Sequence, residues 1–492
     1  MLTETAHENF TSFLRRPVPR RASFWLRVRE YAVPPTMIET ATARRLTGDW
    51  AGACAAAGFD VDFDLRTVKH TWGRDIAARL RDDLRRLAPD LLRWHMPRIA
   101  PDGLLRPGLT MSLARYGAER PDGPGTLHLV ARTPPARADA VQRVSLALWD
   151  GSRATTHAVS RAAYPHPRPD RRFRLDLHRH LWDAGRADEL RTRSGVELPL
   201  SSAAFMPDAD TEWVPQGYLC AVDRWAAEVE ILLRAEGRGP GPVAVRLGQR
   251  HRLLLEQADG EGGLRLTVLS ADNTPADGSA DNRAESVLVL SADNKPALPV
   301  LPDASTWVLP DLQLLRSGEI TADRLHPLVA AALVPDAPAA GSGGAPAPFR
   351  PDEPRPVDCR GSRHRIGLVD GVLVALDHDP AELRREELLV ALDGPPLPCL
   401  RAIDEAHRSP ECLTGVRERL LHGDLTGALA IVEGLLGPEA LLRDGALRDE
   451  LEEVARRKVE YGLFRAGLAL RHPGVRRRGK TDGRVPTAGN RR

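Results

Sequence analysis

The sequence predicts an α+β protein with helices towards both ends of the chain and strands in the middle. Between residues 37 and 95, apolar residues recur at spacings of three and four, which is the period of an amphipathic helix. From Leu109 onwards, short runs with the period of strands follow one another. Beyond residue 335, a segment rich in Pro, Ala and Gly precedes a hairpin pattern and further helices. We therefore expect an N-terminal helical module, a central antiparallel β-rich domain with helices, and a C-terminal hairpin followed by a helical module.

The chain has 492 residues. A single hydrophobic core rarely supports a chain of this length, so several domains are expected. A change in period marks the first predicted boundary, and changes in composition or charge mark the linker and the tail. The predicted parts are a helical module (1–100), a β-rich α+β domain (101–334), a linker (335–357), a hairpin with helices (358–470) and a disordered basic tail (471–492).

The composition indicates a cytoplasmic protein without a membrane span. No run of about 18 apolar residues is present, and Met1–Arg16 is polar and lacks the apolar region of a secretory signal. The chain contains five cysteines, which are too scattered for a disulfide framework and fit a reducing compartment. The chain is rich in arginine, which could reflect either nucleic-acid binding or the codon bias of a high-GC genome. Codon bias is the better explanation, because the net charge is only +2.

One stretch of sequence occurs twice. Arg44–Ala53 reads R-R-L-T-G-D-W-A-G-A, and Arg419–Ala428 reads R-L-L-H-G-D-L-T-G-A. Each copy ends one helical pattern and begins another, and its Asp can accept the free N–H groups of the following turn. The stretch resembles the corner of a tetratricopeptide-type helical hairpin, a module that usually binds other proteins. The resemblance implies a protein-protein interaction role.

Two helices of the N-terminal module are predicted in detail. Thr36 and Glu39 form a T-x-x-E capping box, which predicts a helix from Met37 to Leu46. An apolar stripe predicts a longer helix over Trp72–Leu87. The opposite face of that helix carries mixed charges, interpreted as solvated: Arg79, Arg81, Asp82, Asp83, Arg85 and Arg86.

The segment Trp94–Arg98, W-H-M-P-R, follows this helical region and has two interpretations. It can lie in a cleft, with Trp94 stacking on a ligand. Alternatively, Trp94 is a core anchor that ends the helical module, which we favour because large aromatic side chains are usually buried.

The central domain begins with an antiparallel meander. Its predicted strands are Leu109–Tyr116, Thr126–Arg132 and Val144–Trp149, and a helix is predicted over Tyr218–Glu236. His178 and His180 would share one face if their segment were a strand, giving either a metal pair or a polar strand face. The tripled S-A-D-N sequence could bind Ca²⁺ through its carboxylates, but Asx-type turns explain it better. The three carboxylates are Asp272, Asp281 and Asp293.

The C-terminal module begins with a hairpin. His364–Leu368 and Val372–Leu376 flank the turn dipeptide Asp370-Gly371. The segment Asp379–Glu382 then combines a helix N-cap, Pro at the first helical position and a D-x-x-E box. We expect the following helix to run to about Leu392.

Cysteine and histidine residues gather around this hairpin. Thiolate and imidazole groups are the usual zinc ligands, and several of these residues could converge on one metal ion. The candidates are Cys359, His364, His378, Cys399 and Cys412. No C-x₂-C or H-x₃-H pair is present, so the alternative is that the cysteines are small buried residues. A pairing of Cys359 with His364 or His378 as nucleophile and base has no supporting local motif.

Common catalytic signatures are missing from the sequence. It contains no phosphate loop, no G-x-G-x-x-G after a strand, no H-E-x-x-H and no G-x-S-x-G. The tail could contact nucleic acid electrostatically through Arg476, Arg477, Arg478 and Lys480. The alternative for the tail is a solubilising role without a partner.

Two further stretches carry a resemblance over the whole chain. L-A-P-D-L-L-R-W-H (Leu87–His95) and C-R-G-S-R-H-R (Cys359–Arg365) resemble multi-domain proteins of high-GC actinobacteria. The resemblance implies a source and no activity. The sequence therefore predicts a non-enzymatic interaction or scaffold protein that engages an unidentified protein partner and needs no cofactor. The alternatives are a nucleic-acid-associated regulator using the tail and a metal-dependent enzyme using the C-terminal Cys/His cluster.

Overall fold

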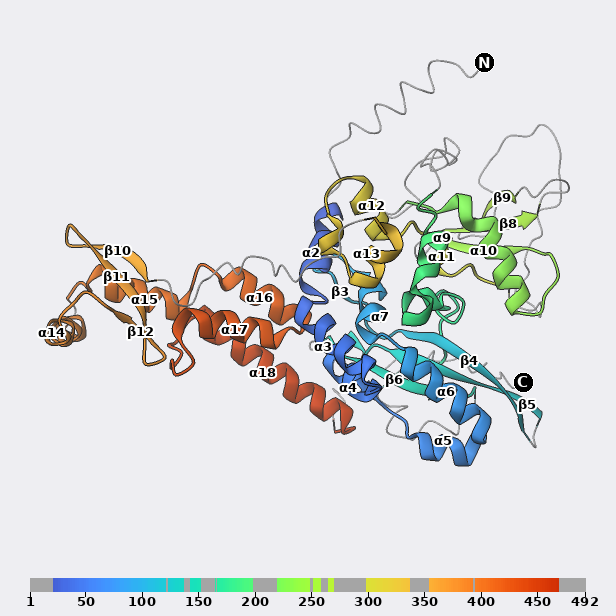
Figure 1. Cartoon of the computed structure of the whole chain (residues 1–492), viewed down its shortest axis with the longest axis horizontal. Coiled ribbons are helices and arrows are strands. Elements are labelled where there is room, and N and C mark those ends of the chain that lie inside the picture. Colours follow the sequence, from blue (N-terminus) through green and yellow to red (C-terminus); the bar gives the residue numbers. More distant parts are fainter. Residues whose placement is uncertain are drawn as a thin grey trace, which may run out of the picture.

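The structure, a computed structural model, confirms the α+β class with helical ends and small, mainly antiparallel sheets (Figure 1). It describes residues 21–120, 123–136, 142–151, 164, 166–197, 219–247, 251–257, 264–269, 298–336, 354–392 and 394–468. The described residues up to 336 are called the N-terminal body below, and residues 354–468 are called the C-terminal arm. No helix in the described ranges is both long and apolar enough to cross a membrane.

The first third of the N-terminal body consists of helices that pack on a sheet. The helices are α2 (Arg21–Tyr31), α3 (Pro35–Leu46), α4 (Trp50–Ala56), α5 (Leu65–Trp72), α6 (Arg74–Arg86) and α7 (Pro89–His95). The main strands are β1 (Phe59–Val61), β4 (Thr110–Arg120), β5 (Gly123–Arg132) and β6 (Val144–Trp149), and β2 (Arg98–Ile99) pairs with β3 (Leu104–Leu105). The four-stranded sheet has the order β1-β6-β5-β4, with β1 parallel to β6 and the other pairs antiparallel.

One hydrophobic core joins these helices to the sheet. Leu80 and Leu84 of α6 and Leu91 of α7 are fully buried with Leu129 and Leu146 of the sheet. The predicted meander of three antiparallel strands is present, and β1 adds a parallel strand that no sequence pattern indicates. The predicted boundary at residue 100 therefore runs through a single core.

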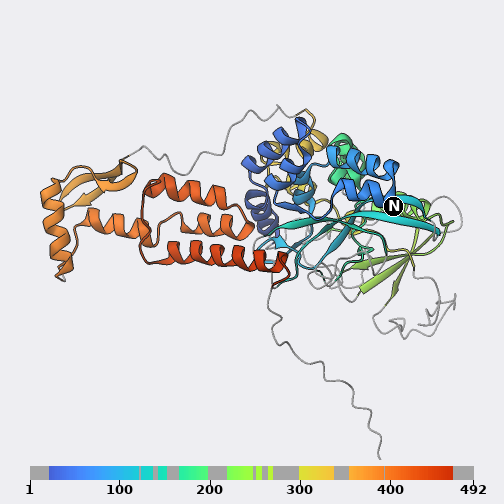
Figure 2. The same cartoon turned by 90° about the horizontal axis from the view of Figure 1, so that it is seen from below.

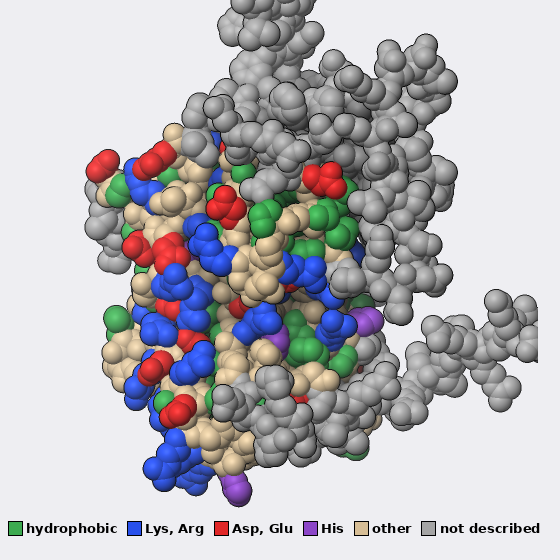
Figure 3. Space-filling model, turned by 90° about the vertical axis from the view of Figure 1, so that its right-hand side faces the viewer, with side chains coloured by type: hydrophobic (Ala, Val, Ile, Leu, Met, Phe, Trp, Pro, Cys, Tyr) green, Lys and Arg blue, Asp and Glu red, His purple; other side chains and the backbone are tan. Residues whose placement is uncertain are grey.

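A second, smaller core lies beside the first. Its strands β7 (Val243–Leu247), β8 (His251–Gln257) and β9 (Leu264–Leu269) form an antiparallel sheet under α10 (Val222–Ala235). Short elements complete the body: η2 (Arg179–Leu181), η3 (Ala184–Glu189), α9 (Leu190–Ser194), α11 (Asp303–Thr306), α12 (Pro310–Arg316), η6 (Ala322–Arg324) and α13 (Pro327–Leu333). On the face turned away from the arm, basic side chains lie among acidic and apolar ones (Figure 3).

The predicted capping box at Thr36 is wrong. Helix α3 begins one residue earlier than Thr36, with Pro34 at the N-cap, Pro35 at the first helical position and no side-chain cap bond. Proline suits that position because its fixed φ matches a helix and its missing N–H would have no helical partner. The Thr36 side chain is therefore inside the first turn and cannot cap it.

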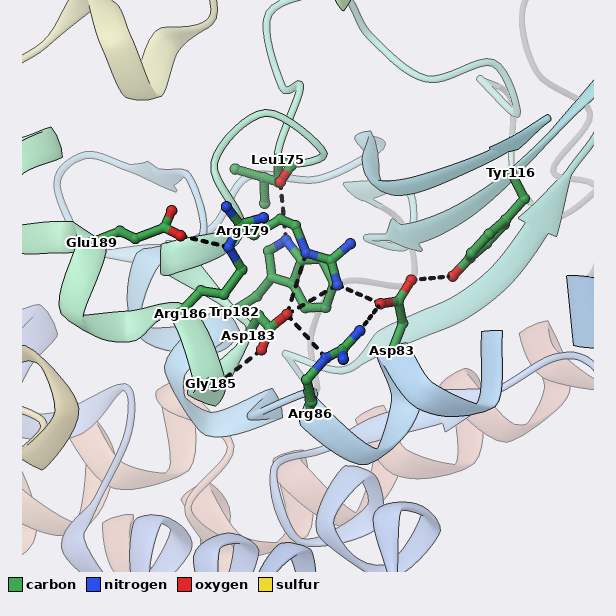
Figure 4. A network of polar contacts seen from close by, with 10 residues as sticks. All are labelled: Asp83, Arg86, Tyr116, Leu175, Arg179, Trp182, Asp183, Gly185, Arg186 and Glu189. Carbon is green, nitrogen blue, oxygen red and sulfur yellow. Dashed lines mark hydrogen bonds and ion pairs between the residues drawn. The ribbon is translucent and has the colours of Figure 1, made fainter. Parts of the chain in front are cut away.

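The charged face of α6 is also less solvated than predicted. Asp83 is buried, and its carboxylate accepts hydrogen bonds from Tyr116 Oη at 2.7 Å, from Arg86 at 2.9 Å and from Arg179 (Figure 4). Arg179 also bonds to Asp183, which caps η3 through the Gly185 N–H. This network fixes the segment of η2 and η3 against α6 and β4.

The two copies of the repeated corner have the same conformation. Gly48 and Gly423 have φ of +80° and +86°, values that favour glycine. Asp49 and Asp424 then cap the next helix by accepting the N–H of the residue three positions on, at 2.8 Å and 2.9 Å. In both copies the first Arg also pairs with the capping Asp, at 3.2 Å and 2.8 Å. The predicted Asp caps are thus confirmed at both corners.

We expect Asp424→Ala and Asp49→Ala each to lower the free energy of unfolding by about 1 kcal/mol, because each removes an N-cap. The loss should be larger for Asp424, whose carboxylate is the more buried of the two. Asp75→Ala is the control, since Asp75 lies exposed in the first turn of α6 without a cap bond. Urea unfolding would measure all three, and equal losses for Asp75 and Asp424 would contradict the capping role.

The C-terminal arm is elongated and projects from the body (Figures 1 and 2). Strands β10 (Arg355–Cys359), β11 (Ser362–Val369) and β12 (Val372–Ala375) form an antiparallel sheet. The helices are α14 (Pro380–Ala391), α15 (Pro398–Arg408), α16 (Leu413–His422), α17 (Leu425–Leu436) and α18 (Ala446–Arg465). The predicted hairpin is confirmed as β11 and β12. The third strand of the sheet, β10, begins inside the predicted linker.

The arm docks on the body through α16 and α18. Arg93 of α7 is buried and donates to the His422 carbonyl at 3.0 Å, and the Tyr31 and His422 rings stack. Tyr461 of α18 donates to Asp60 of β1 at 2.6 Å. The second corner, at the end of α16, is therefore part of the contact between arm and body.

Several sequence predictions lie outside the described residues. They are the basic tail with Arg476, Arg477, Arg478 and Lys480, and the S-A-D-N carboxylates Asp272, Asp281 and Asp293. They stay predictions.

Candidate metal centre

The antiparallel pair of β10 and β11 brings Cys359 and His364 to the same side of one sheet. Cys359 pairs with Ser362 across the turn, and Val357 pairs with His364. Since paired residues and residues two apart on a strand share a face, Cys359 and His364 lie diagonally on the same face. Arg360 and Gly361 form the tight turn between them, both with positive φ. The local pairing thus replaces the short C-x₂-C spacing that the sequence lacks.

The other two ligand candidates come from the segments that follow. His378 comes between the end of β12 and α14, and Cys399 is the second residue of α15, directly after Pro398. Helix α15 packs on all three strands, which carries Cys399 to the hairpin. One potential ligand atom from each of Cys359, His364, His378 and Cys399 lies within 4.8 Å of the others.

The donor atoms lie close enough together for a tetrahedral metal to bind them after a small shift. Zinc bound by two thiolates and two imidazoles has bonds of about 2.0–2.3 Å, which places the ligand atoms about 3.3–3.8 Å apart. The His364 Nδ1 and His378 Nε2 atoms are 2.8 Å apart. At that distance one ring nitrogen must carry a proton, so a bound metal would displace this proton and move the rings apart by about 0.5 Å.

A carboxylate orients one of the imidazoles. His378 Nδ1 lies 3.4 Å from Glu382 Oε2, four residues later in the first turns of α14. Histidine ligands of metals almost always donate their second N–H to such a partner, which fixes the ring and its tautomer. This contact leaves Nε2 of His378, the atom that faces His364, as the ligand atom. The D-x-x-E pattern at Asp379 was interpreted only as a cap, so the role of Glu382 beside His378 was missed.

Both cysteines are fully buried, and both are free thiols. Burial raises the pKa of the Cys399 thiol to about 11, and the neighbouring Cys359 thiol adds to the rise. Without a cation the Cys399 thiol is therefore protonated at neutral pH. A thiolate needs a cation here, and a divalent metal held by both sulfurs would supply it.

The fifth predicted ligand, Cys412, is not part of the cluster. It is half-buried before α16 and packs against the hydrophobic core of the arm. Its burial raises the pKa of its thiol. Cys412 thus fits the alternative interpretation of a small core residue.

Chemically, the cluster suits a structural site. Two thiolates and two imidazoles fill all four positions of tetrahedral zinc, whereas catalytic zinc keeps a position open for water or substrate. Soft sulfur ligands together with imidazole favour zinc over Mg²⁺ or Ca²⁺. The centre would join the β10–β12 sheet, the start of α14 and the start of α15.

Comparisons of the chain with protein-family models, with curated proteins and with solved structures find no match.

Proposed function

We propose that the protein acts by binding a partner protein through α14 of a metal-stabilised arm. The observation that carries this proposal is a row of solvent-exposed leucines on α14 and at its C-cap residue, Leu392. Leu388, Leu389 and Leu392 are 66%, 51% and 78% exposed. The helix lies at the end of the arm that is farthest from the body (Figures 1 and 2).

The spacing of these leucines places them on one side of the helix. Residues at i and i+4, such as Leu388 and Leu392, are neighbours on a helix surface, and Leu389 lies beside them. Single exposed apolar residues are common, but a contiguous group of them marks an interaction site. An amphipathic helix with anchors at these spacings is the form that partners recognise in an apolar groove.

Two arginines extend the same face towards the start of α14. Arg384 and Arg385 are exposed, and each lies one turn before a leucine. Their guanidinium groups bond only to backbone carbonyls of their own helix, at 3.2 Å and 3.1 Å, in the part of the chain that the structure describes. The face therefore fits a partner whose apolar groove is bordered by carboxylates at one end.

The metal centre explains how α14 keeps its position. The helix follows His378 directly, begins at the Asp379 cap and contacts the centre through Glu382. Its buried Glu386 accepts a hydrogen bond at 2.8 Å from Arg360 of the hairpin turn. Loss of the metal would therefore disturb both contacts that hold α14, the one through Glu382 and the one through Glu386.

We expect Leu388→Asp combined with Leu389→Asp to weaken partner binding by at least about 100-fold, because burying each leucine contributes about 1.5–3 kcal/mol. Leu441→Asp is the matched control, since Leu441 is 87% exposed on the same arm but lies outside α14. Partners would be captured from source cells with the full chain and both variants, then purified for direct titration.

The proposal requires a partner whose affinity depends on α14 and falls with added salt when Arg384 and Arg385 are present. Equal capture by the double variant and the wild type would contradict it. Self-association of the purified chain that Leu388→Asp abolishes would make a second copy the occupant, which also contradicts it.

A further inference from the structure

A cavity of about 450 Å³ lies in the N-terminal body, far from the metal centre. Ligand pockets in proteins typically measure about 300–1,000 Å³. Its walls come from α2, α7, the η2–α9 segment and the region around α11 and α12. Much of the lining is aromatic or aliphatic and includes Trp25, Trp94, Met96, Phe173 and Trp307.

Most of the charged side chains that line this cavity are positive. Six arginines line it against one carboxylate, Asp303. Three of these arginines are held by buried or half-buried acids. The ion pairs are Arg29–Asp311, Arg172–Asp303 and Arg193–Glu228, each at 2.7 Å.

Two further arginines lack a carboxylate partner among the described residues. The Arg106 guanidinium lies 6.0 Å from the centre of the Phe173 ring. Arg224 donates to the Trp307 carbonyl at 3.2 Å, and burial lowers the pKa of its guanidinium. Asp303 lies near Arg106 and Glu228 near Arg224, but neither carboxylate forms an ion pair with that arginine in the described ranges. An anion in the cavity would therefore be attracted by both guanidinium groups.

Two histidines add polar atoms that have no partner. His95 Nε2 and His180 Nδ1 are both buried and make no hydrogen bond within the described ranges. Burial lowers the pKa of both imidazoles well below its usual range, so both rings are neutral. A neutral ring offers one N–H donor, and buried polar atoms without partners are rare in folded proteins.

We propose that this cavity binds a small organic anion, with a carboxylate or phosphate group between Arg106 and Arg224 and an apolar or aromatic body against the tryptophans. This site goes beyond the proposed role of α14 and shares no residue with it. The segment Trp94–Arg98 lines the cavity as a whole, which supports the cleft interpretation of that segment. Trp94 itself is almost fully buried, so it is also a core residue.

The test uses the full chain and two dyes of similar shape. 8-Anilinonaphthalene-1-sulfonate is an aromatic anion, and 1-anilinonaphthalene is its neutral counterpart. We expect one molecule of the anionic dye to bind per chain, at least about tenfold more tightly than the neutral dye. Arg106→Met and Arg224→Met should each weaken the anionic dye about tenfold and leave the neutral dye unchanged. Arg191→Met is the control, because Arg191 lies on α9 and pairs with Glu197 outside the cavity.

Competition then separates the two anion chemistries. Benzoate and phenyl phosphate would each be titrated against the bound dye, and the better competitor names the preferred group. Ala304→Phe places a ring in the cavity and should abolish dye binding while the thermal transition is retained. Equal affinity for both dyes, or anionic-dye binding that neither Arg variant nor Ala304→Phe reduces, would overturn the proposal.

Discussion

Cys399→Ser is expected to remove the metal and to destabilise the C-terminal arm by about 4 kcal/mol when free zinc exceeds its Kd a thousandfold. The reason is linkage, because a metal that binds the folded arm and not the unfolded chain stabilises the folded state by its own binding free energy. Calorimetry of the full chain, with and without a chelator, measures the effect. The wild-type arm should lose the same stability on chelation, and the variant should not respond.

Cys412→Ser provides the matched control for this prediction. It changes a thiol of the same arm that packs on the core and lies outside the cluster. We expect it to keep one metal ion per chain and to respond to the chelator as the wild type does. A chelator response that is lost in Cys412→Ser and kept in Cys399→Ser would contradict the ligand set.

Asp311→Ala is expected to lower the free energy of unfolding of the N-terminal body by about 3–5 kcal/mol. Asp311 is fully buried and holds three helices together. It accepts both hydrogen bonds of the Arg29 fork at 2.7 Å and one from Trp94 Nε1 at 3.1 Å. Its removal leaves the Arg29 cation buried without a counter-charge, which costs far more than the pair itself contributes. Urea unfolding monitored by tryptophan fluorescence would report the loss.

A double variant separates the charge effect from the loss of packing. Arg29→Met with Asp311→Leu removes both charges and fills their space, so it should be more stable than Asp311→Ala alone. Glu452→Ala is the control for an exposed pair, and its loss should be below about 1 kcal/mol because Glu452 meets Arg448 in solvent. A double variant no more stable than Asp311→Ala would show that the buried cation is not the cause.

Much of the local structure could be predicted because it depends on neighbours in the sequence. The Asp49 and Asp424 caps, the Asp370-Gly371 turn and the stripe of α6 follow from contacts within a few residues. The pairing of β1 with β6 could not be predicted, because it joins residues 59 and 144 across helices α5 to α7 and strands β2 to β5. Long-range pairings of this kind leave no period in the sequence.

The candidate site was predicted in its residue types and not in its geometry. Four of the five proposed ligands lie together, and the hairpin register that unites Cys359 with His364 was the information that spacing alone did not provide. Cys412 was included because sequence distance cannot tell a ligand from a core thiol. Only one part of the cavity lining, Trp94–Arg98, could be predicted from the sequence. Arg106 and Arg224 come from separate segments and line the same cavity only in the fold.

The most direct test of the central claim is X-ray absorption at the zinc edge, combined with metal analysis of the full chain purified without chelator. The metal centre predicts one zinc ion per chain with two sulfur neighbours at about 2.3 Å and two nitrogen neighbours at about 2.0 Å. Cys399→Ser should lose this spectrum, and Cys412→Ser should keep it. A metal-free chain in which Cys359 and Cys399 are joined by a disulfide, or zinc surrounded by other ligands, would contradict the metal centre.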